Sequence, residues 1–525
     1  MRDFHQPGRS MVIATNGMCA TSHPIAAQTA VSTLQAGGNA MDAALSAAVL
    51  LGIAEPQMTG IGGDCFVLFK PSGSEDVLAL NGSGRAPAGT SAAALRERGL
   101  STVPTEGADP VTIPTAMDAF CRLNADWGRM TLGDVLAPAI RYADEGIPIA
   151  PRVAFDLAKD APRLSESGRR HYLINGEPPR AGQIFRAPGQ AEVLRKVTQQ
   201  GRDGFYTGEV AEDMVNTLRA AGGCHTLDDF ANAEANYTTP ISSAYQGIEL
   251  LEHPPNGHGA TAMLMLNILS KFDLPSMGLL SADRAHVEAE AAKLAYDTRN
   301  RVIADPDHCA RLDHMLSMET ADKLGALIQM DQALPMPAPS AEAIHKDTIY
   351  ITVVDKDRMA VSLIYSIFHG FGSGLASDKF GILLQNRGAG FTLEEGHPNE
   401  LAPGKRPLHT IIPGMLRRNG KVLMPFGVMG GAYQPNGHTR LITNLHDFGL
   451  DVQEALDAPR SFADGQTMQI ERGYSEEVRA DLAQRGHNVV VPETPLGGGQ
   501  AIILREDGLL EAGSDPRKDG CALGY

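Results

Sequence analysis

A threonine that directly follows a proline-rich segment is the residue in this sequence best placed to do chemistry. Thr348 opens a run rich in β-branched residues, TIYITVV, immediately after Asp347. A threonine hydroxyl alone is a weak nucleophile, and a free α-amine on the same residue is one way to activate it. Cutting the bond between Asp347 and Thr348 would create that amine. Position alone instead favours an ordinary strand residue, because threonine is common in strands.

The elements around this junction would place Thr348 where a linker enters a sheet. Residues 333–347, ALPMPAPSAEAIHKD, contain three prolines and no strong periodicity, which predicts an exposed, flexible connection. Residues 348–368 form two β-branched runs separated by DKDR, which predicts a β-hairpin.

The rest of the chain divides at the same point. The residue pattern of the final third predicts stacked sheets flanked by helices. Strands are expected at 381–386, 410–416, 421–428 and 500–506, and helices near 437–457 and 474–486. Earlier segments predict a strand within 11–23, two helices between 24 and 51, a strand at 65–69 and a helix at 282–302. Residues from about 90 to 330 are otherwise expected to be mostly helical.

Composition excludes several classes of protein. The chain has 525 residues, of which 43% are hydrophobic and 20% charged, as in ordinary globular proteins and unlike disordered or fibrous ones. With 45 basic and 62 acidic residues, the net charge of −17 argues against binding nucleic acid or an anionic membrane surface.

Cysteine spacing and the N-terminus predict a cytoplasmic location. The six cysteines are scattered and form no CxxC pair, which favours reduced thiols. The first residues do not follow the pattern of a signal peptide, and the longest apolar stretch, Ala43 to Ile53, is too short to span a bilayer. His253 and His258 flank a Pro-Pro pair without a third ligand at suitable spacing, so no metal is expected there.

Ordered motifs along almost the whole chain carry a resemblance to a known family. They include AGGNAMDAA (36–44), EPQMTGIGGDCF (55–66), GFYTGEVAE (204–212), HPPNGHGA (253–260), TVVDKDRMAVSLIYS (352–366), PGKRPLHT (403–410), MGG (429–431) and GSDPR with a terminal GY (513–525). With these motifs the sequence resembles the γ-glutamyltransferase (glutathione hydrolase) family of N-terminal nucleophile hydrolases.

The resemblance implies a fold and a self-processing enzyme without a cofactor. It implies an α/β (α+β) four-layer αββα sandwich that two segments of one precursor form jointly. The precursor would cut itself at Asp347–Thr348, giving a large segment 1–347 and a small segment 348–525. The two segments would be each other's partners in one intertwined domain. Whether this unit pairs further is left open.

The resemblance also assigns catalytic roles. Thr348 matches the nucleophile, and Ser366 matches a second hydroxyl held near its amine. Gly430 and Gly431 match a backbone N–H pair that stabilises the oxyanion, and glycine lets the backbone approach closely. Taken alone, two adjacent glycines would indicate a plain turn. Thr348 would attack an amide carbonyl, and water or another amine would resolve the acyl-enzyme.

The residues that recognise γ-glutamyl groups in the family are not retained. The arginine for the substrate α-carboxylate falls on Ser83, with Arg85 two residues later. The acidic residue for the α-amine falls on Gly390, and an asparagine falls on Phe368.

Two further substitutions lead to a hypothesis about the substrate. The paired serines that follow RPL are His409 and Thr410. A buried ammonium needs an acceptor, whereas Arg85, Arg387 and His409 would suit a carboxylate without a neighbouring amine. Oxamate amidohydrolase and glutaryl- or cephalosporin-type acylases, in the same superfamily, have such substrates. Arg85 could equally be a solvated loop residue, and Arg387 a structural ion-pair partner.

Three functions stay open on the sequence. The favoured one is a Thr-nucleophile amidohydrolase acting on a small-molecule amide of a carboxylate. The alternatives are a true γ-glutamyltransferase and an unprocessed member that binds a ligand without catalysis. Retention of Thr348, Ser366 and the glycine pair argues against the last.

Overall fold

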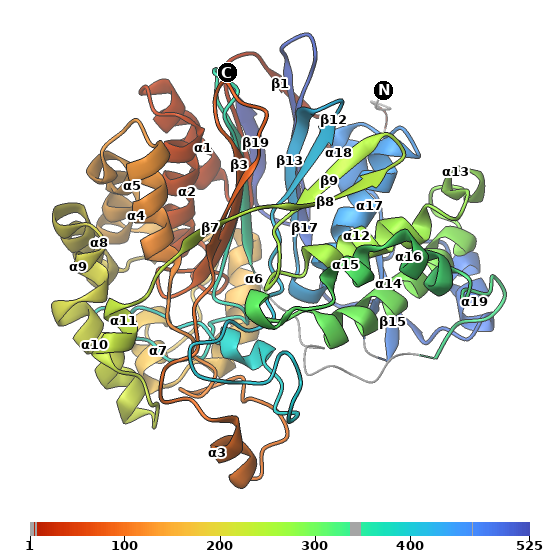
Figure 1. Ribbon diagram of the computed structural model, residues 1–525. Helices are drawn as coiled ribbons and strands as arrows, with labels where there is room; N and C mark the ends of the chain where they lie inside the picture. The colour runs from red at the N-terminus through yellow and green to blue at the C-terminus, as the bar shows by residue number, and fades with distance from the viewer. Residues whose placement is uncertain (1–4, 6–7, 336–347, 465) are drawn as a thin grey trace.

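A computed structural model describes residue 5 and residues 8–335, 348–464 and 466–525. Most of the segment predicted as a linker, 333–347, and with it Asp347, lies outside the described residues. Within them, two seven-stranded antiparallel sheets face each other, and helices cover both outer faces (Figure 1).

The first sheet contains the strand that follows Thr348, and we call it the Thr348 sheet. In spatial order its strands are β19 (Cys521–Gly524), β2 (Met18–Thr21), β10 (Ile349–Val354), β11 (Ala360–Ser366), β3 (Asp64–Lys70), β4 (Leu78–Gly82) and β7 (Asn236–Thr238). The predicted hairpin of residues 348–368 is confirmed as β10 and β11.

The second sheet ends next to the glycine pair, and we call it the Gly430 sheet. In spatial order its strands are β1 (Val12–Ala14), β18 (Leu510–Ser514), β17 (Gly498–Leu504), β13 (Lys421–Met429), β12 (Gly414–Arg418), β9 (Ile248–Glu252) and β8 (Ile241–Tyr245). Smaller sheets join β14 (Ser461–Asp464), β15 (Thr467–Ile470) and β16 (Val489–Val490), and β5 (Ile147–Pro148) with β6 (Ile184–Phe185).

Helices form the two outer layers, and together with the sheets they give the expected αββα sandwich. Those on the side of the Thr348 sheet are α1 (Pro24–Gln35), α2 (Ala40–Ala54), α4 (Ala116–Trp127), α5 (Leu132–Glu145) and α8 (Pro188–Gln200). Those on the side of the Gly430 sheet include α12 (Gly259–Leu269), α14 (Ala282–Val302), α17 (Gln434–His446) and α18 (Val452–Asp457).

Ten further α-helices complete the described part of the chain. They are α3 (Ala92–Glu97), α6 (Pro151–Asp160), α7 (Glu166–Tyr172), α9 (Asp203–Tyr206), α10 (Gly208–Ala220), α11 (Leu227–Ala231), α13 (Leu274–Met277), α15 (Leu312–Leu316), α16 (Met318–Gly325) and α19 (Glu476–Gln484).

Local sequence signals explain which predictions hold. The helix predicted at 282–302 is confirmed as α14, and the two predicted early helices are α1 and α2. The strand predicted at 381–386 is wrong. Gly381 has a φ of +67°, and the chain there turns back so that the N–H of Ile382 donates to the Ser377 hydroxyl at 3.1 Å.

The expectation of mostly helix between residues 90 and 330 is also incomplete. The pair β5 and β6 interrupts that region, and three more strands, β7, β8 and β9, join the edges of the two main sheets. These strands are short, and only β9 is mainly buried, so their apolar pattern is weak.

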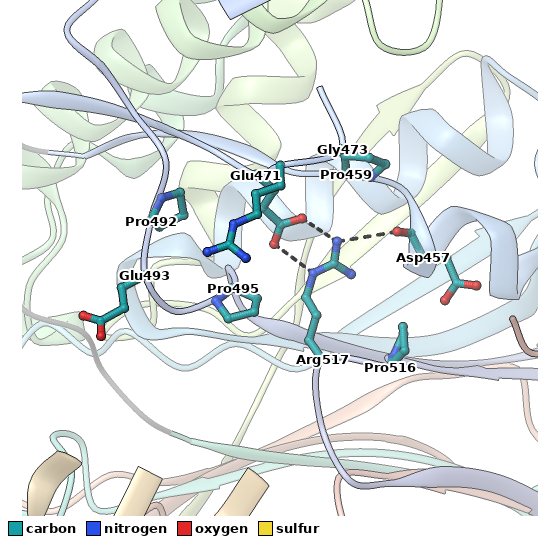
Figure 2. A pocket seen from close by; sticks show the side chains of 10 residues that line it. Asp457, Pro459, Glu471, Gly473, Pro492, Glu493, Pro495, Pro516 and Arg517 are labelled. Carbon is teal, nitrogen blue, oxygen red and sulfur yellow. Dashed lines mark hydrogen bonds and ion pairs between the residues drawn. The ribbon is translucent and has the colours of Figure 1, made fainter. Parts of the chain in front are cut away.

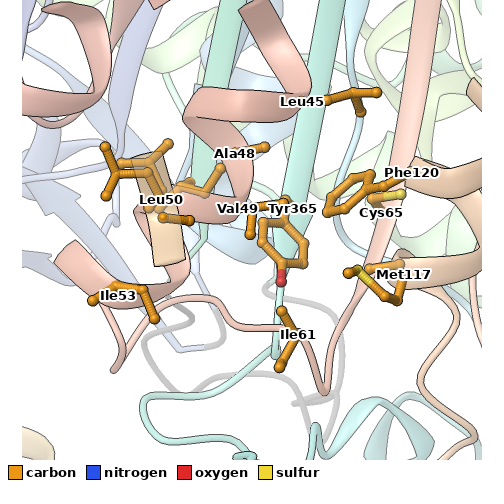
Figure 3. Packing of buried hydrophobic residues seen from close by; sticks show 14 of the residues in the cluster. Leu45, Ala48, Val49, Leu50, Ile53, Ile61, Cys65, Met117, Phe120 and Tyr365 are labelled. Atoms are coloured by element: carbon orange, nitrogen blue, oxygen red, sulfur yellow. The ribbon is translucent and has the colours of Figure 1, made fainter. Parts of the chain in front are cut away.

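The core under the Thr348 sheet is built around α2. Every residue of α2 is buried, and its side chains pack against Tyr365 of β11 and against Met117 and Phe120 of α4 (Figure 3). Alanine fills much of this helix, and small side chains let it lie close to the sheet. Strands β10 and β11 are therefore buried on both faces, which fixes the position of their ends.

The two sheets are in close contact beside the end of β13. A Cβ atom added to Gly427 would lie 2.3 Å from the ring of Tyr350, which is the second residue of β10. The Tyr350 hydroxyl is 2.7 Å from the Ser362 hydroxyl, so the ring is also held at its far end. Glycine at position 427 thus sets the spacing between the two sheets near Thr348.

We expect Gly427→Ala to lower the free energy of unfolding by about 1–3 kcal/mol, because the methyl group overlaps a buried, fixed ring. Urea unfolding followed by circular dichroism measures the change. Gly325→Ala, at the end of α16 with its nearest neighbour at 3.7 Å, serves as the matched control and should have little effect. Equal midpoints for the two variants would contradict the inferred sheet spacing.

Candidate active site

The hairpin register brings two hydroxyls together at one end of the Thr348 sheet. Ile349 of β10 pairs with Tyr365 of β11, so the next position along each strand sets Thr348 opposite Ser366. Their hydroxyl oxygens are 3.3 Å apart, and Thr348 is only 2% exposed. The backbone N–H of Phe368 donates to the Ser366 hydroxyl at 2.8 Å. Ser366 is therefore held on two sides.

The predicted glycine pair lies where β13 ends in the facing sheet. Gly430 has φ 118° and ψ 25°, and Gly431 begins a short 3-10 turn that leads into α17. A Cβ atom on Gly430 would lie 2.9 Å from the Cα atom of Gly497. Both the left-handed conformation and this contact favour glycine.

Thr348 and Gly430 line one small recess between the sheets. We call it the Thr348 recess, and its lining residues are Arg152, Asp156, Lys159, Thr348, Met429, Gly430, Thr494, Pro495, Gly497 and Lys518. The lining therefore joins α6, the start of β10, the end of β13 and two loops. A hydroxyl, a glycine backbone and several charged groups share this space, and such an arrangement can support attack on a carbonyl.

A fully buried charged cluster stands on the other side of Ser366. Asp64 opens β3 directly opposite Ser366 in the β3–β11 register. Arg387 contacts the Asp64 carboxylate through Nε and Nη2, each at 3.3 Å, and His409 Nε2 lies 2.6 Å from Asp64 Oδ2. Arg387 also donates to the Thr410 hydroxyl at 3.2 Å.

Mutual pairing sets the protonation of this cluster. Burial would raise the pKa of the Asp64 carboxyl, but the charges of Arg387 and His409 and their hydrogen bonds lower it below its usual value. Burial and the Arg387 charge lower the pKa of His409 to about 4, against the opposing pull of Asp64. Near neutral pH, the cluster thus contains a carboxylate, a guanidinium and a neutral imidazole.

Four of the predicted substrate-binding residues meet here. Arg387 and His409 both contact Asp64, Arg387 also contacts Thr410 directly, and the Arg387 guanidinium lies 4.2 Å from the Phe368 ring centre. Arg387 has no exposed surface and is engaged with Asp64, which matches the ion-pair alternative considered for it.

Arg85 lies apart from that cluster. Its side chain is 48% exposed, donates to the Gly404 carbonyl at 2.8 Å and is 3.6 Å from the Asp305 carboxylate. It lines a separate cleft of about 950 Å³. The structure therefore does not bring Arg85 together with Arg387 and His409.

Ser83 and Gly390, the family positions for the arginine and the acidic residue, are both packed against other parts of the protein. Ser83 is buried, and its hydroxyl accepts a hydrogen bond from Asn256 at 3.0 Å. A Cβ atom at Gly390 would lie 2.5 Å from the Leu408 carbonyl oxygen, so no acidic side chain fits there without rearrangement.

Five charged residues of the site did not follow from the sequence. Asp64 stands in GIGGDC, Lys518 follows GSDPR, and Arg152, Asp156 and Lys159 belong to one helical segment. Asp64 is part of a motif given above, and a charged residue inside that glycine-rich motif was the available signal. The other four carry no such signal.

One group of possible metal ligands occurs in the part of the chain that the structure describes. It consists of the buried residues His286, Glu290 and His487. The Lys293 ammonium already lies 2.6 Å from the Glu290 carboxylate, and the two imidazoles contact each other at 2.8 Å. The residues as placed satisfy one another and do not form an open coordination sphere. None of the described helices is long and apolar enough to span a bilayer.

Comparison with known proteins adds a family and relatives. Residues 26–525 match the family model described as Gamma-glutamyltranspeptidase. The chain is 35% identical to the Glutathione hydrolase-like YwrD proenzyme of Bacillus subtilis, with 98% of this chain and 99% of that protein aligned. It is 32% identical to the Oxamate amidohydrolase proenzyme of Klebsiella pneumoniae over the same shares.

A solved structure supports the fold independently. The crystal structure of cephalosporin acylase from Bacillus halodurans matches with a TM-score of 0.93 at 36% identity. The match covers 100% of this chain and 99% of that one. The sandwich described above is thus the fold of that acylase.

We expect His409 to make the protein less stable in acid. Its folded pKa is about 4 and its unfolded pKa about 6.5, so the stability present above pH 6.5 is lost as the pH falls toward 4. Between pH 7 and pH 5 the loss should be about 2 kcal/mol. Urea unfolding at both pH values should show a smaller loss for His409→Gln, whose amide can still donate to Asp64. The exposed His308→Gln control should follow the wild type, and equal losses in all three proteins would refute the assignment.

Proposed function

This chain belongs to the gamma-glutamyltranspeptidase family, and we propose that it is a self-cleaving amidohydrolase with Thr348 as its nucleophile. The observation that carries the proposal is the contact of 3.3 Å between the Thr348 and Ser366 hydroxyls, beside the recess that Gly430 also lines. A reactive hydroxyl, a supporting hydroxyl and a glycine backbone at one point are the groups that amide hydrolysis requires.

The mechanism follows from these positions. Once the bond before Thr348 is cut, its α-amine takes the proton from its own hydroxyl as Oγ1 attacks the amide carbonyl. Ser366 holds the Thr348 hydroxyl in place. The N–H groups of Gly430 and Gly431 stabilise the oxyanion. As the C–N bond breaks, the α-ammonium returns its proton to the nitrogen of the leaving amine or ammonia, and water then hydrolyses the acyl-enzyme.

The two products, residues 1–347 and 348–525, would stay together as one unit. In the Thr348 sheet, β10 and β11 of the small segment pair with β2 and β3 of the large segment. In the Gly430 sheet, β12 pairs with β9 in the same way. Cutting one peptide bond removes none of these ladders, so the strands remain bound through shared hydrogen bonds and a shared core.

The proposed substrate is the amide of a small carboxylate that lacks a neighbouring amine. The family position for an acidic partner of the amine is Gly390, and it is packed against Leu408. Phe368 and the paired Arg387–Asp64 unit fill the adjoining space. The one carboxylate among these groups, Asp64, is already engaged by Arg387 and His409, so it does not offer a substrate ammonium a separate acceptor. The names of two similar proteins, the oxamate amidohydrolase and the cephalosporin acylase, support this choice.

We place the enzyme in the cytoplasm. All six cysteines are free thiols, and burial raises the pKa of Cys19 and Cys65. Thiols that form no disulfide suit a reducing compartment.

Intact mass tests the nucleophile. We expect the purified protein to give two fragments of about 37 and 19 kDa, the second beginning at Thr348. Thr348→Ala should stay uncut, because the proposed cleavage needs the hydroxyl. Thr102→Ala, at an exposed position, is the matched control and should be cut as usual. A full-length mass for the wild type would reject self-cleavage and favour the non-catalytic alternative.

Paired anilides test the substrate class. Hydrolysis of glutaryl-p-nitroanilide should exceed that of γ-glutamyl-p-nitroanilide by about tenfold or more in kcat/KM, because burying an unpaired ammonium costs at least about 1.4 kcal/mol. The two compounds differ only in the α-amino group. A preference for the γ-glutamyl compound would instead identify a true γ-glutamyltransferase or glutathione hydrolase.

A further inference from the structure

The charges that line the Thr348 recess do not balance. Its lining holds three basic residues, Arg152, Lys159 and Lys518, and one acidic residue, Asp156. Arg152 Nε contacts both oxygens of Asp156, at 2.9 and 3.0 Å, so these two charges offset each other. Within the described residues, neither Lys159 nor Lys518 has a carboxylate at ion-pair distance.

Lys518 is fixed in place by its neighbours on either side. Asp515 accepts the N–H of Gly499 at 2.7 Å, and it also pairs with Arg460. Asp519 accepts the N–H groups of Arg152 and Val153 at the start of α6. The loop between these anchors crosses from the Gly430 sheet to the Thr348 sheet and brings Lys518 to the recess.

The stem of Lys518 runs beside the proposed oxyanion donors. A Cβ atom on Gly498 would lie 2.8 Å from Cγ and 3.0 Å from Cε of Lys518. Gly498 pairs with Met429, the residue before Gly430, in the β13–β17 ladder. The lysine is only 8% exposed. Its cation therefore approaches the point at which Thr348 would hold a carbonyl.

Arg517, the residue before Lys518, is a cation of the same loop that forms a structural ion pair. Arg517 is held by both oxygens of Glu471, at 2.5 and 2.8 Å, in a different pocket of about 460 Å³ (Figure 2). The two pockets share Pro495, and Arg517 and Lys518 thus serve opposite sides of one loop. Arg517 therefore has a structural role in its ion pair with Glu471, whereas Lys518 has no comparable carboxylate partner among the described residues.

Lys159 reaches the recess from α6. Arg152, Asp156 and Lys159 stand four and three residues apart, so they share one face of this helix. The Lys159 ammonium donates to the Thr494 hydroxyl at 3.4 Å, a long contact to a neutral group. The Lys159 side chain is thus directed toward the loop that contains Thr494, Pro495 and Gly497.

Nearby acids do not neutralise Lys518 fully. Burial raises the pKa of Glu55 to about 7, although its hydrogen bond from Ser22 and the Lys518 charge lower it. Asp519 and Asp156 act on Glu55 in the raising direction. Near neutral pH, Glu55 is therefore partly protonated, and the recess keeps a net positive lining.

We propose that Lys159 and Lys518 form an anion subsite that binds a carboxylate on the acyl half of the substrate. This inference rests on the proposed function. Two charged regions described above lie beside the Thr348–Ser366 pair, the Asp64 cluster and this recess. In the Asp64 cluster the guanidinium is buried and paired, whereas in the recess two ammonium groups stay available. Because the recess is small, the acyl chain is short, as in monoamides of oxalic, malonic and succinic acid.

Paired acids and diamides test the subsite. Ammonia release from oxamate, malonamate and succinamate is compared with release from the neutral analogues oxamide, malonamide and succinamide. For Lys518→Met, the ratio of kcat/KM between each acid and its diamide should fall about tenfold or more, mostly through KM. Lys518→Arg should retain most of the ratio, and Lys159→Met should lower it independently.

Matched controls separate this inference from the proposed function. Lys323→Met, on the exposed face of α16, should leave the ratio unchanged. An equal fall for acids and diamides would show a structural role and overturn the subsite. A wild-type chain that stays uncut would instead reject the proposed function.

A measurement on the wild type covers the case in which the lysine variants do not mature. Oxalate, malonate and succinate should inhibit the cut enzyme competitively, whereas their diamides at equal concentration should inhibit far less. Equal inhibition by charged and neutral compounds would overturn the anion subsite without affecting the assignment of Thr348.

Discussion

The antiparallel register of three strands is the constraint on which the site depends. β10 sets Thr348 opposite Ser366, and β11 sets Ser366 opposite Asp64. A slip of one residue would turn alternate side chains to the other face of the sheet and separate these groups. Burial on both faces, by α2 on one side and by the Gly430 sheet on the other, prevents that slip.

Electrostatics divides the surroundings of Thr348 into a closed side and an open side. On the closed side, Asp64 is enclosed by Arg387 and His409, and removing one partner would leave an unpaired buried charge. On the open side, the recess presents the ammonium groups of Lys159 and Lys518. The Arg387 guanidinium is therefore engaged in a structural ion pair. Lys159 and Lys518 are the cations that we propose for binding a ligand.

The sequence could predict the elements whose signal is local. The β10–β11 hairpin follows from two runs of β-branched residues separated by a turn, and α14 follows from a repeat of three to four residues. The glycine pair follows from the family motif. Contacts between distant residues had no such signal. Asp64 and Arg387 are 323 residues apart, and only the fold shows that they pair. Arg85 lies close in sequence to the family position, yet its loop carries it to another cleft.

In the proposed function, the chain order of the site requires that folding precede the cut before Thr348. Asp64 and Lys159 belong to residues 1–347, whereas Thr348, Gly430 and Lys518 belong to residues 348–525. Each sheet takes strands from both parts, so neither part alone has partners for all its strand edges. While the two parts belong to one chain, their strands pair within that chain, and the entropic cost is only that of closing the loops between them. A nucleophile that is released only after Thr348 meets Ser366 would therefore become active in a site that is already complete.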